Sequence, residues 1–513
     1  MNLGSVFAVP AVLLSSLAWA DSERPQVSVS VSADWNNITN ISRTVPTTQH
    51  LASAYTLRKH PLNKALLSAL RELGTNDTRL QLWYSIPKQA VAELKEPTAT
   101  ETFWDFQYMD PTVIDYFSNT SGIHHINIGA IPRWMFKVSP MDVPQDPGAT
   151  FFRYTDGTTG ALLKDPSGKQ FAEYQSRIYQ WYTQGGFIDE IGNVHKSGYH
   201  FKIDYWGILN EPDSENKLDV VQYTKIWDAV AEAIRKIDPH VRFFGPEVSG
   251  AEVEWAGYFL NPKNHAPSAP AIDFFSLHNY VVGKNEPATW QVDYFTSPNR
   301  TGPGSSSGAF IGQLRSVMKI RDELSPATEI VIDELGTANL PKLSDGWHPD
   351  VPYSTFHPLY WVAMGANWAA DFITAEEFGI PLISMTQMLG YPTQSPSCTM
   401  VNWTNAKPNA HYWILKLVNS NFGPGDRLVS TLSSSQDIVA LAASTMSGRK
   451  ILVVNTSDRT VEVDYRGVFP RASLQIETVD ETSGEHSPRV QRINGTTVKL
   501  APFGVAVVTE IDK

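Results

Sequence analysis

The feature that most constrains the fold of this chain is a regular alternation of strand-like and helix-like segments between about residues 27 and 410. Short runs of β-branched and aromatic residues predict strands, and apolar residues at steps of three and four predict amphipathic helices. The segment Tyr223–Ile237 is an example of the second kind, because Ile226, Val230 and Ile234 follow one helical face. Strands that alternate with helices favour a parallel sheet with crossover connections.

Eight strands can be counted in this region. They are expected at Val27–Val31, Arg79–Trp83, His125–Gly129, Tyr205–Leu209, Val241–Phe244, Phe274–Leu277, Ile330–Asp333 and Pro381–Met385. A doubly wound nucleotide-binding sheet is the rival fold, but no Gly-x-Gly-x-x-Gly follows a strand and no Gly-Lys-Ser/Thr occurs. The pattern therefore predicts an α/β protein with a (β/α)8 TIM barrel.

A different pattern begins after about residue 425. Five strand-like runs follow one another closely, separated by turn pairs such as Ser447-Gly448 and Asn494-Gly495, and no helical period intervenes. We therefore expect the barrel over residues 21–424 and an accessory C-terminal antiparallel β-sandwich over residues 425–513. The strand-like residues at the start of the barrel segment are an alternative contribution to this second sheet.

Two long insertions interrupt the expected barrel. One covers residues 136–200, between the third and fourth strands, and the other covers residues 281–310, after the sixth strand. Loops at the carboxyl ends of barrel strands build the functional face of such a fold. Both insertions are expected on that face.

The composition of the chain limits which kinds of molecule it can bind and which kinds of site it can form. The 41 Lys and Arg residues against 53 Asp and Glu residues give a net charge of −12, and no basic run occurs, which argues against nucleic acid. A hydrophobic content of 42% with 18% charged residues excludes disorder as the main state. The single cysteine, Cys398, excludes an intramolecular disulfide and cysteine-based metal sites. No other metal-ligand spacing recurs, so neither a metal nor a cofactor is expected.

The first residues predict export. An apolar run from Val6 to Leu17 ends in Ala18-Trp19-Ala20 before the charged Asp21, which is the pattern of a signal peptide over residues 1–20. The run is shorter than the ~20 apolar residues that a membrane span needs. We therefore expect a secreted, extracellular glycoprotein without a membrane partner. Its glycosylation sequons are at Asn37, Asn40, Asn76, Asn119, Asn299, Asn402, Asn455 and Asn494.

Two of the expected strands end in a carboxylate. Asn210-Glu211-Pro212 follows the fourth strand, and Glu334 follows the seventh. The carboxyl ends of all barrel strands open on one face, so two carboxylates there can serve as acid/base and nucleophile on a glycosidic bond. The alternative is that each glutamate only caps a strand or begins a helix. The repetition of the same context favours a functional pair.

These motifs, with the strand count between them, resemble the retaining glycoside hydrolases that place the acid/base after strand four and the nucleophile after strand seven. The chain looks most like glycoside hydrolase family 39, the family of β-xylosidases and α-L-iduronidases, which carries a β-sandwich beside the barrel. The resemblance implies that Glu211 is the acid/base and Glu334 the nucleophile. It also implies that Asn210 hydrogen-bonds the sugar 2-hydroxyl, and that His278 and Tyr280 contact the sugar and orient Glu334.

Two residues after the third strand are further candidates for substrate binding. Arg133 can read a carboxylate and Trp134 can stack on a sugar ring, although a structural ion pair is an equal alternative for Arg133. The expected function is that of a secreted retaining glycoside hydrolase, β-xylosidase-like, acting on a plant or microbial oligosaccharide or polysaccharide. The alternatives are a glucuronidase, arabinosidase or endo-glycanase on the same scaffold, or a non-catalytic carbohydrate-binding pseudo-enzyme.

Overall fold

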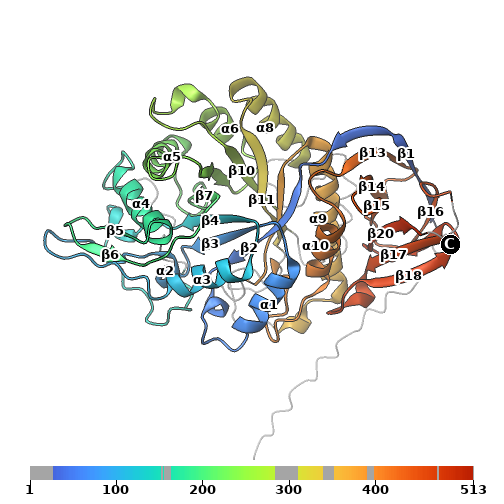
Figure 1. Ribbon diagram of the computed structural model, residues 1–513, viewed down its shortest axis with the longest axis horizontal. Coiled ribbons are helices and arrows are strands. Elements are labelled where there is room, and N and C mark those ends of the chain that lie inside the picture. The colour runs from blue at the N-terminus through green and yellow to red at the C-terminus, as the bar shows by residue number, and fades with distance from the viewer. Residues whose placement is uncertain are drawn as a thin grey trace, which may run out of the picture.

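The computed structural model describes residues 27–151, 154, 163–282, 310–338, 352–389, 398–470 and 473–511. The predicted signal peptide and the sequon at Asn299 lie outside these residues. Figure 1 shows two parts side by side, a barrel of strands and helices and a second sheet formed mainly by the C-terminal residues.

Eight consecutive β/α units form the barrel. Its strands are β2 (Val45–Leu51), β3 (Asp77–Trp83), β4 (Ile123–Gly129), β7 (Tyr205–Ile208), β8 (Arg242–Phe244) with β9 (Pro246–Val248), β10 (Phe274–Val282), β11 (Glu329–Ala338) and β12 (Leu382–Met385). The helices that follow them in turn are α1 (Asn63–Leu73), α3 (Met109–Asn119), α4 (Lys169–Thr183), α5 (Val220–Arg235), α6 (Val253–Phe259), α8 (Phe310–Leu324), α9 (Pro358–Phe378) and α10 (Ala410–Asn421). A short helix, α2 (Pro87–Ala90), lies between β3 and α3.

The order of these strands confirms the predicted TIM barrel. The sheet runs β8-β7-β4-β3-β2-β12-β11-β10-β9, and neighbouring strands pair in parallel. Because β8 and β9 are consecutive segments separated only by Gly245, the two ends of this order meet. The barrel is therefore nearly closed, and its carboxyl strand ends share one face.

The interior of the barrel is unusually polar. In β3, Leu80 and Leu82 join the apolar cluster beneath the helices, whereas Asp77, Arg79 and Gln81 occupy the alternating positions that point inward. Barrel interiors are usually filled by branched apolar side chains. Buried charges in this position are costly unless they are paired, so the polar interior indicates a site.

The second sheet contains nine strands. They are β1 (Val27–Ile41), β13 (Arg427–Ser433), β14 (Ile438–Thr445), β15 (Gly448–Asn455), β16 (Val461–Gly467), β17 (Ser473–Val479), β18 (Arg489–Asn494), β19 (Thr497–Leu500) and β20 (Val505–Glu510). Their order is β18-β17-β20-β15-β14-β13-β1-β16-β19, with antiparallel pairs except for β1 and β16. The sheet has an apolar core of its own, which includes Val29, Ile451 and Val463. The predicted accessory C-terminal β-structure is confirmed.

The prediction of a barrel strand at Val27–Val31 is wrong. These residues belong to β1, which pairs with β13 and β16 in the second sheet, as the stated alternative allowed. Val29 and Val31 are buried while Ser28 and Ser30 are exposed, the alternation of a strand with one solvated face. The first barrel strand is β2. Its sequence is too polar to be recognised as a barrel strand, since Gln49 lies in the interior, where it accepts from Arg79.

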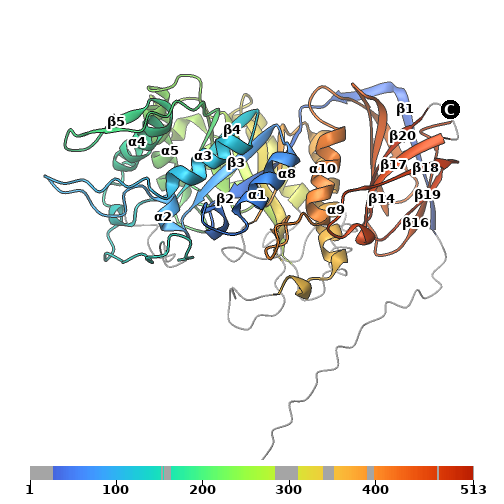
Figure 2. The ribbon, with the colours of Figure 1, turned by 60° about the horizontal axis from the view of Figure 1, so that its bottom comes forward.

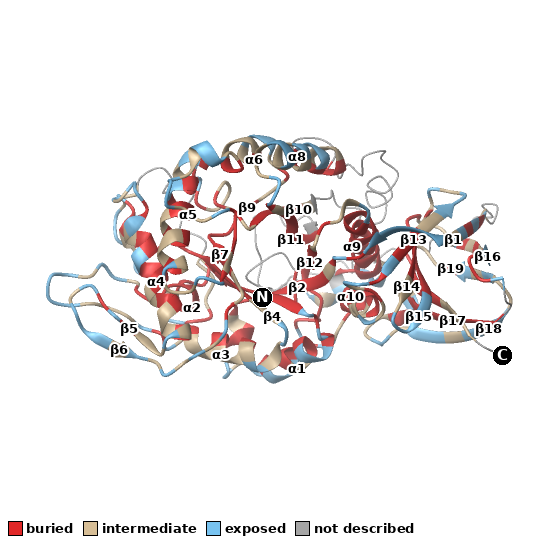
Figure 3. Ribbon diagram, turned by 45° about the horizontal axis from the view of Figure 1, so that its top comes forward, coloured by how far each residue is buried: buried red, intermediate tan, exposed pale blue. Residues whose placement is uncertain are grey.

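Helices α9 and α10 join the barrel to the second sheet (Figure 2). Helix α9 contacts β11 and β12 on one side and β14 and β15 on the other, while α10 contacts β2, β17 and β20. Seventeen of the 21 residues of α9 are buried, so the helix is red over almost its whole length in Figure 3. A helix buried all round belongs to the interior of a large core. The barrel and the second sheet therefore share one apolar interface.

The predicted insertion at residues 136–200 divides between the two ends of the barrel. A loop follows the carboxyl end of β4, and α4 then returns the chain to the amino end. The hairpin of β5 (Gly186–Ile188) and β6 (Val194–Lys196) follows α4, so it lies away from the carboxyl face. Most of the second predicted insertion lies outside the described residues. Among the helices described, none combines the length and the apolar character needed to span a membrane.

Candidate active site

Glu211 and Glu334 lie together at the carboxyl ends of β7 and β11. One carboxylate oxygen of each, together with Nδ1 of His278, lies within 4.8 Å of the other two atoms. The side chain of Glu334 is 2% exposed and that of Glu211 is 20% exposed. The structure therefore brings the two predicted carboxylates together and gives only one of them ready access to solvent.

Both carboxylate oxygens of Glu334 accept hydrogen bonds. The hydroxyl of Tyr280 donates to Oε2 at 2.5 Å, and Nη1 of Arg79 donates to Oε1 at 2.5 Å. Burial and the charge of Glu334 raise the pKa of Tyr280 well above its ordinary value, so this hydroxyl stays a donor. Donors on both oxygens fix the orientation of the Glu334 carboxyl group.

Glu211 has different neighbours. His278 Nδ1 lies 2.8 Å from Oε1 of Glu211 and 3.5 Å from Oε2 of Glu334, and Ser214 Oγ donates to Oε2 of Glu211 at 2.7 Å. Burial lowers the pKa of His278, but the carboxylates of Glu334 and Asp333 outweigh it and hold this pKa well above its ordinary value. His278 therefore donates first to Glu211 and lies between the two carboxylates.

The backbone that carries Glu211 is strained. Leu209 and Glu211 have φ angles of 66° and 37°, in the left-handed region that side chains other than glycine rarely adopt. Such residues cost about 1–3 kcal/mol each and persist where neighbouring contacts hold them. Here Asn127 Nδ2 donates to the Leu209 carbonyl at 2.8 Å, and the Glu211 amide donates to the Glu247 carbonyl at 3.0 Å. The turn presents Asn210 and Glu211 at the barrel mouth.

Arg79 is a residue of the candidate site that sequence reasoning missed. Its guanidinium, 1% exposed, donates to Glu334 and to Gln49 Oε1 at 2.5 Å, to Asn210 Oδ1 at 2.6 Å, and to Glu247. Burial lowers the pKa of Arg79, but the surrounding carboxylates raise it further than burial lowers it. The available signal was a charged residue within the strand-like run Arg79–Trp83.

Two buried carboxylates beneath the site were also missed. Nε of Arg79 lies 3.7 Å from Asp333, and Asn127 Nδ2 donates to Glu247 at 2.7 Å. Burial raises the pKa of Glu247 to about 7, against the opposing charge of Arg79. Glu247 lies inside β9, three residues beyond the predicted strand Val241–Phe244, so its context only loosely matches the one that selected Glu211 and Glu334.

Asn210 is held from both sides. Its Oδ1 accepts from Arg79, and its Nδ2 donates to Glu215 Oε1 at 2.9 Å. Trp83 Nε1 donates to the same oxygen at 2.5 Å. Burial and the charge of Glu211 raise the pKa of Glu215 well above its ordinary value. The amide of Asn210 is therefore fixed in orientation next to Glu211.

Arg133 and Trp134 lie in the loop after β4. Arg133 donates to the carbonyls of Tyr154 at 2.8 Å and Ser139 at 3.2 Å, and Trp134 Nε1 donates to the Glu93 carbonyl at 2.8 Å. These bonds fasten the loop to itself and to the segment after β3. The described contacts do not link either residue to Glu211 or Glu334, and their roles in sugar binding stay predictions.

Among the residues that the structure describes, two groups of side chains have the spacing of metal ligands. They are Glu211, His278 and Glu334, and Glu247, His278 and Asp333. In both groups the acids already face the cationic side chains of Arg79 and His278, which supply the positive charge that a cation would bring. The expectation that the chemistry needs no metal stays a prediction.

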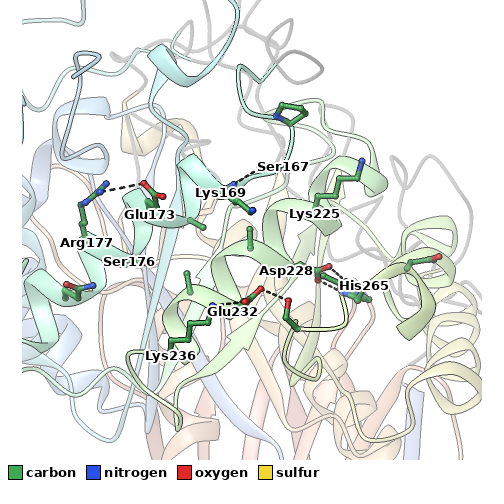
Figure 4. A pocket seen from close by; sticks show the side chains of 18 of the residues that line it. Ser167, Lys169, Glu173, Ser176, Arg177, Lys225, Asp228, Glu232, Lys236 and His265 are labelled. Carbon is green, nitrogen blue, oxygen red and sulfur yellow. Dashed lines mark hydrogen bonds and ion pairs between the residues drawn. The ribbon is translucent and has the colours of Figure 1, made fainter. Parts of the chain in front are cut away.

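A separate groove lies on the outside of the barrel, between α4 and α5. It has a volume of about 1150 Å³ and is lined by charged side chains, including Lys169, Lys225 and Glu232 (Figure 4). Its Asp228 accepts from His265 Nδ1 at 2.5 Å, and the other ring nitrogen of His265 lies 2.5 Å from the Phe259 carbonyl. None of the residues that line the groove belongs to the carboxylate site.

The nearly closed (β/α)8 barrel with an accessory sheet is a fold that this chain shares with solved glycoside hydrolases. Solved structures of such enzymes agree with the chain along nearly its whole length. A glucosidase from Croceicoccus marinus covers 95% of this chain with all of its own, at a TM-score of 0.58 and 14% identity. An α-L-arabinofuranosidase from Thermotoga maritima gives 0.60 at 15% identity, covering 94% of this chain and 99% of its own. The family 39 enzyme from Xanthomonas axonopodis pv. citri gives 0.55 at 14% identity, covering 94% and 97%.

Sequence comparisons match shorter segments. Residues 435–508 match the family described as the D-apionate lactonase C-terminal immunoglobulin-like domain, which lies within the second sheet. A β-xylosidase from Geobacillus stearothermophilus is 27% identical over 113 residues. That match covers 21% of this chain and 21% of the β-xylosidase, so the chain matches only about a fifth of the length of this relative.

Proposed function

We propose that this protein is a retaining glycoside hydrolase that cleaves O-glycosidic bonds by double displacement. One observation carries the proposal: the carboxylate oxygens of Glu211 and Glu334 lie within 4.8 Å of each other in different surroundings. Retaining enzymes separate their two carboxyl groups by about 5–5.5 Å, whereas inverting enzymes leave about 6.5–9.5 Å for a water molecule. The short separation supports retention.

In this proposal Glu334 is the nucleophile. Tyr280 and Arg79 hold its carboxyl group in place through hydrogen bonds to its two oxygens. A carboxylate oxygen of Glu334 forms a bond to the anomeric carbon as the bond to the leaving oxygen breaks. Because the side chain of Glu334 is almost fully buried, water has little access to its carboxyl group before the sugar binds.

Glu211 is the acid/base. It gives its proton to the leaving oxygen in the first step, and in the second it takes a proton from the water whose oxygen attacks the anomeric carbon and releases Glu334. Its greater exposure provides the path for that water. His278 bonds to Glu211 and lies next to Glu334, where it orients both carboxylates as the leaving group departs.

The proposed substrate is a β-xyloside or a related pentoside of a plant or microbial oligosaccharide. The relatives named above include a β-xylosidase and an α-L-arabinofuranosidase, which supports a pentose glycone. A glucosidase among the structural relatives keeps a hexose glycone as an alternative within the same class. A pseudo-enzyme is disfavoured because the whole set of donors around Glu334 is in place.

The decisive test is a screen of aryl glycosides of xylose, arabinose, glucose, galactose and glucuronic acid, with NMR of the first-formed product. Turnover with retained anomeric configuration is expected for the wild type. Glu334→Gln is expected to lose turnover, and azide is expected to rescue Glu334→Gly with a glycosyl azide of inverted configuration. Glu329→Gln, at the opposite end of the same strand, is the matched control. An inverted product, or a fully active Glu334→Gln, would refute the mechanism.

A second test separates the acid from the nucleophile. Glu211→Ala is expected to lose about 10²–10⁴-fold on substrates with poor leaving groups and far less on activated ones, because only poor leaving groups need the proton. Equal losses on both kinds of substrate would show that Glu211 is not the acid.

We also propose that the protein is secreted and glycosylated. The predicted signal sequence and the exposure of Asn37, Asn40, Asn76 and Asn494 support this. Asn402 and Asn455 are buried, and their amides donate to Glu485 and to the carbonyls of Arg459 and Ala501, respectively, so these two sequons are poor acceptors. Mass spectrometry of the protein from culture medium tests both statements.

A further inference from the structure

The turn that carries Glu211 is fastened both to itself and to the next strand end. The amide of Ser214 donates to the Glu211 carbonyl at 3.0 Å. Asp213, the residue before Ser214, accepts from the amide of Ser249 at 3.1 Å and also from the Ser249 hydroxyl, between β9 and α6. These bonds fix the backbone on both sides of Ser214 relative to the barrel mouth.

Within this turn the hydroxyl of Ser214 reaches the carboxyl group of Glu211. Ser214 Oγ lies 2.7 Å from Oε2 of Glu211, whereas the Glu211 carbonyl oxygen is farther away, at 3.5 Å. Nδ1 of His278 lies 2.8 Å from the other carboxyl oxygen, Oε1. Each oxygen of Glu211 therefore has its own side-chain partner, one from the turn after β7 and one from β10.

A hydroxyl suits a carboxyl group that changes its protonation state. In the double displacement proposed above, Glu211 is a protonated acid in the first step and an ionised base in the second. A serine hydroxyl can accept a hydrogen bond from the first form and donate one to the second. Burial lowers the pKa of His278, but the nearby carboxylates raise it further, so its protonated ring offers only N–H donors. Of the two partners, Ser214 is the one that can bond to Glu211 in both forms.

We propose that Ser214 is a positioning residue, whose hydroxyl holds the Glu211 carboxyl group in the orientation that protonates the leaving oxygen and later takes a proton from water. The inference rests on the glycosidase function proposed above and deepens it. A misplaced acid/base group slows only the steps that transfer its proton. The alternative role, closing the turn through the Ser214 amide, would affect all substrates alike.

The first test varies the leaving group. The kcat/KM of the wild type, Ser214→Ala and Ser214→Thr is measured on one glycone joined to dinitrophenol, nitrophenol or phenol. Ser214→Ala is expected to lose about 10- to 100-fold on the phenyl glycoside, part of the 10²–10⁴-fold that a general acid typically contributes. On the dinitrophenyl glycoside, whose leaving group needs no proton, the loss should be below about threefold. Ser214→Thr keeps the hydroxyl and should behave like the wild type.

The second test examines the step in which Glu211 is the base. On the dinitrophenyl glycoside the first step is fast, so kcat reports the release of the sugar from Glu334 by water. Ser214→Ala should lower kcat and KM together by about 3- to 10-fold, because the covalent intermediate accumulates. Azide attacks the anomeric carbon without a base, so it should raise this kcat and give a glycosyl azide of retained configuration.

Two other serines provide controls. Ser249→Ala removes the hydroxyl that bonds Asp213 and loosens the same turn without removing a partner of Glu211, so any loss should be equal for all three leaving groups. Ser316→Ala, at an exposed position on α8, controls for the substitution itself. An equal loss on all leaving groups in Ser214→Ala, or its full activity on the phenyl glycoside, overturns the inference. A dependence on the leaving group in Ser249→Ala as large as in Ser214→Ala also overturns it.

Failure of the inference and failure of the proposed function are distinguishable. If Ser214→Ala does not fold, as judged by its melting temperature, Ser214→Cys decides the question, because its thiol is a weak donor. A smaller loss that still depends on the leaving group is then expected, and an equal loss on all substrates overturns the inference. A wild type inactive on every glycoside refutes the proposed function and the inference with it. A loss in Glu211→Ala that depends on the leaving group, beside an indifferent Ser214→Ala, refutes only the inference.

Discussion

Glu247 makes the stability of this protein depend on pH in a way that a single substitution can isolate. Burial raises its pKa from 4.5 to about 7 in the folded chain. Because the folded pKa is the higher one, its contribution to stability is fully present below pH 4.5 and is lost as the pH rises through 7. A shift of this size corresponds to about 3 kcal/mol at 1.36 kcal/mol per pKa unit.

Glu247→Gln is a clean perturbation of this group. Oε2 of Glu247 accepts from Arg79 and from Asn127 Nδ2, whereas Oε1 has no partner among the described residues. A glutamine can keep its carbonyl oxygen in the first position and place its amide nitrogen in the second. The hydrogen bonds are preserved, and only the ionisation is removed.

The assay is urea unfolding of the wild type and Glu247→Gln at pH 5 and pH 8. The free energy of unfolding of the wild type should fall between these pH values by about 2–3 kcal/mol more than that of the variant. Acids that do not interact with Glu247 contribute equally to both proteins and cancel in this comparison. Glu254→Gln, an exposed glutamate on α6, should behave like the wild type. Equal losses in the wild type and Glu247→Gln would refute the reasoning.

Three further perturbations have defined outcomes. In Gly207→Ala the new Cβ would collide with Glu247 Oε1 and lie 2.7 Å from Asn127 Nδ2, so calorimetry should show a loss of about 1–3 kcal/mol, and an unchanged melting temperature would contradict the packing. Arg79→Met leaves buried carboxylates without their cation and should cost about 3–5 kcal/mol in urea unfolding, less at low pH, where the acids take up protons. Residues 21–425 expressed alone should aggregate in size-exclusion chromatography, because α9 loses its cover; a soluble, fully active monomer would argue against this.

Most of the barrel could be predicted because seven of its strands have apolar residues in a run or at every second position and are bounded by helices. The first strand could not, since β2 carries Pro46, Thr47 and Gln49, and Gln49 accepts from Arg79 in the interior. The chosen substitute, Val27–Val31, alternates with serine at every second residue. That period indicates a strand with one exposed face, as in the second sheet. The sequence of Val27–Val31 therefore already indicated that this strand lies outside the barrel.

The carboxylate pair was predictable for a similar reason. Glu211 and Glu334 each follow an apolar run, a local pattern that needs no knowledge of the fold. Arg79 gives no such pattern, because its partners come from four other strands or strand ends and are assembled only when the barrel closes. Local sequence identifies the residues that do chemistry more readily than the buried charges that hold them.

Because β1 lies inside the second sheet, it can pair only after the strands that follow the barrel have been synthesised. The amide of Ser30 bonds to Ser434 across 404 residues of chain, and both neighbours of β1, β13 and β16, come from the C-terminal part. At about 5–20 residues per second, a ribosome needs on the order of 20–80 s to supply these partners. Until then β1 is an unpaired strand whose backbone N–H and C=O groups have no partners on either edge. The second sheet is thus finished only after its strands from β13 onward have been made, and substitutions in β1 should reduce the yield of native protein before they affect its chemistry.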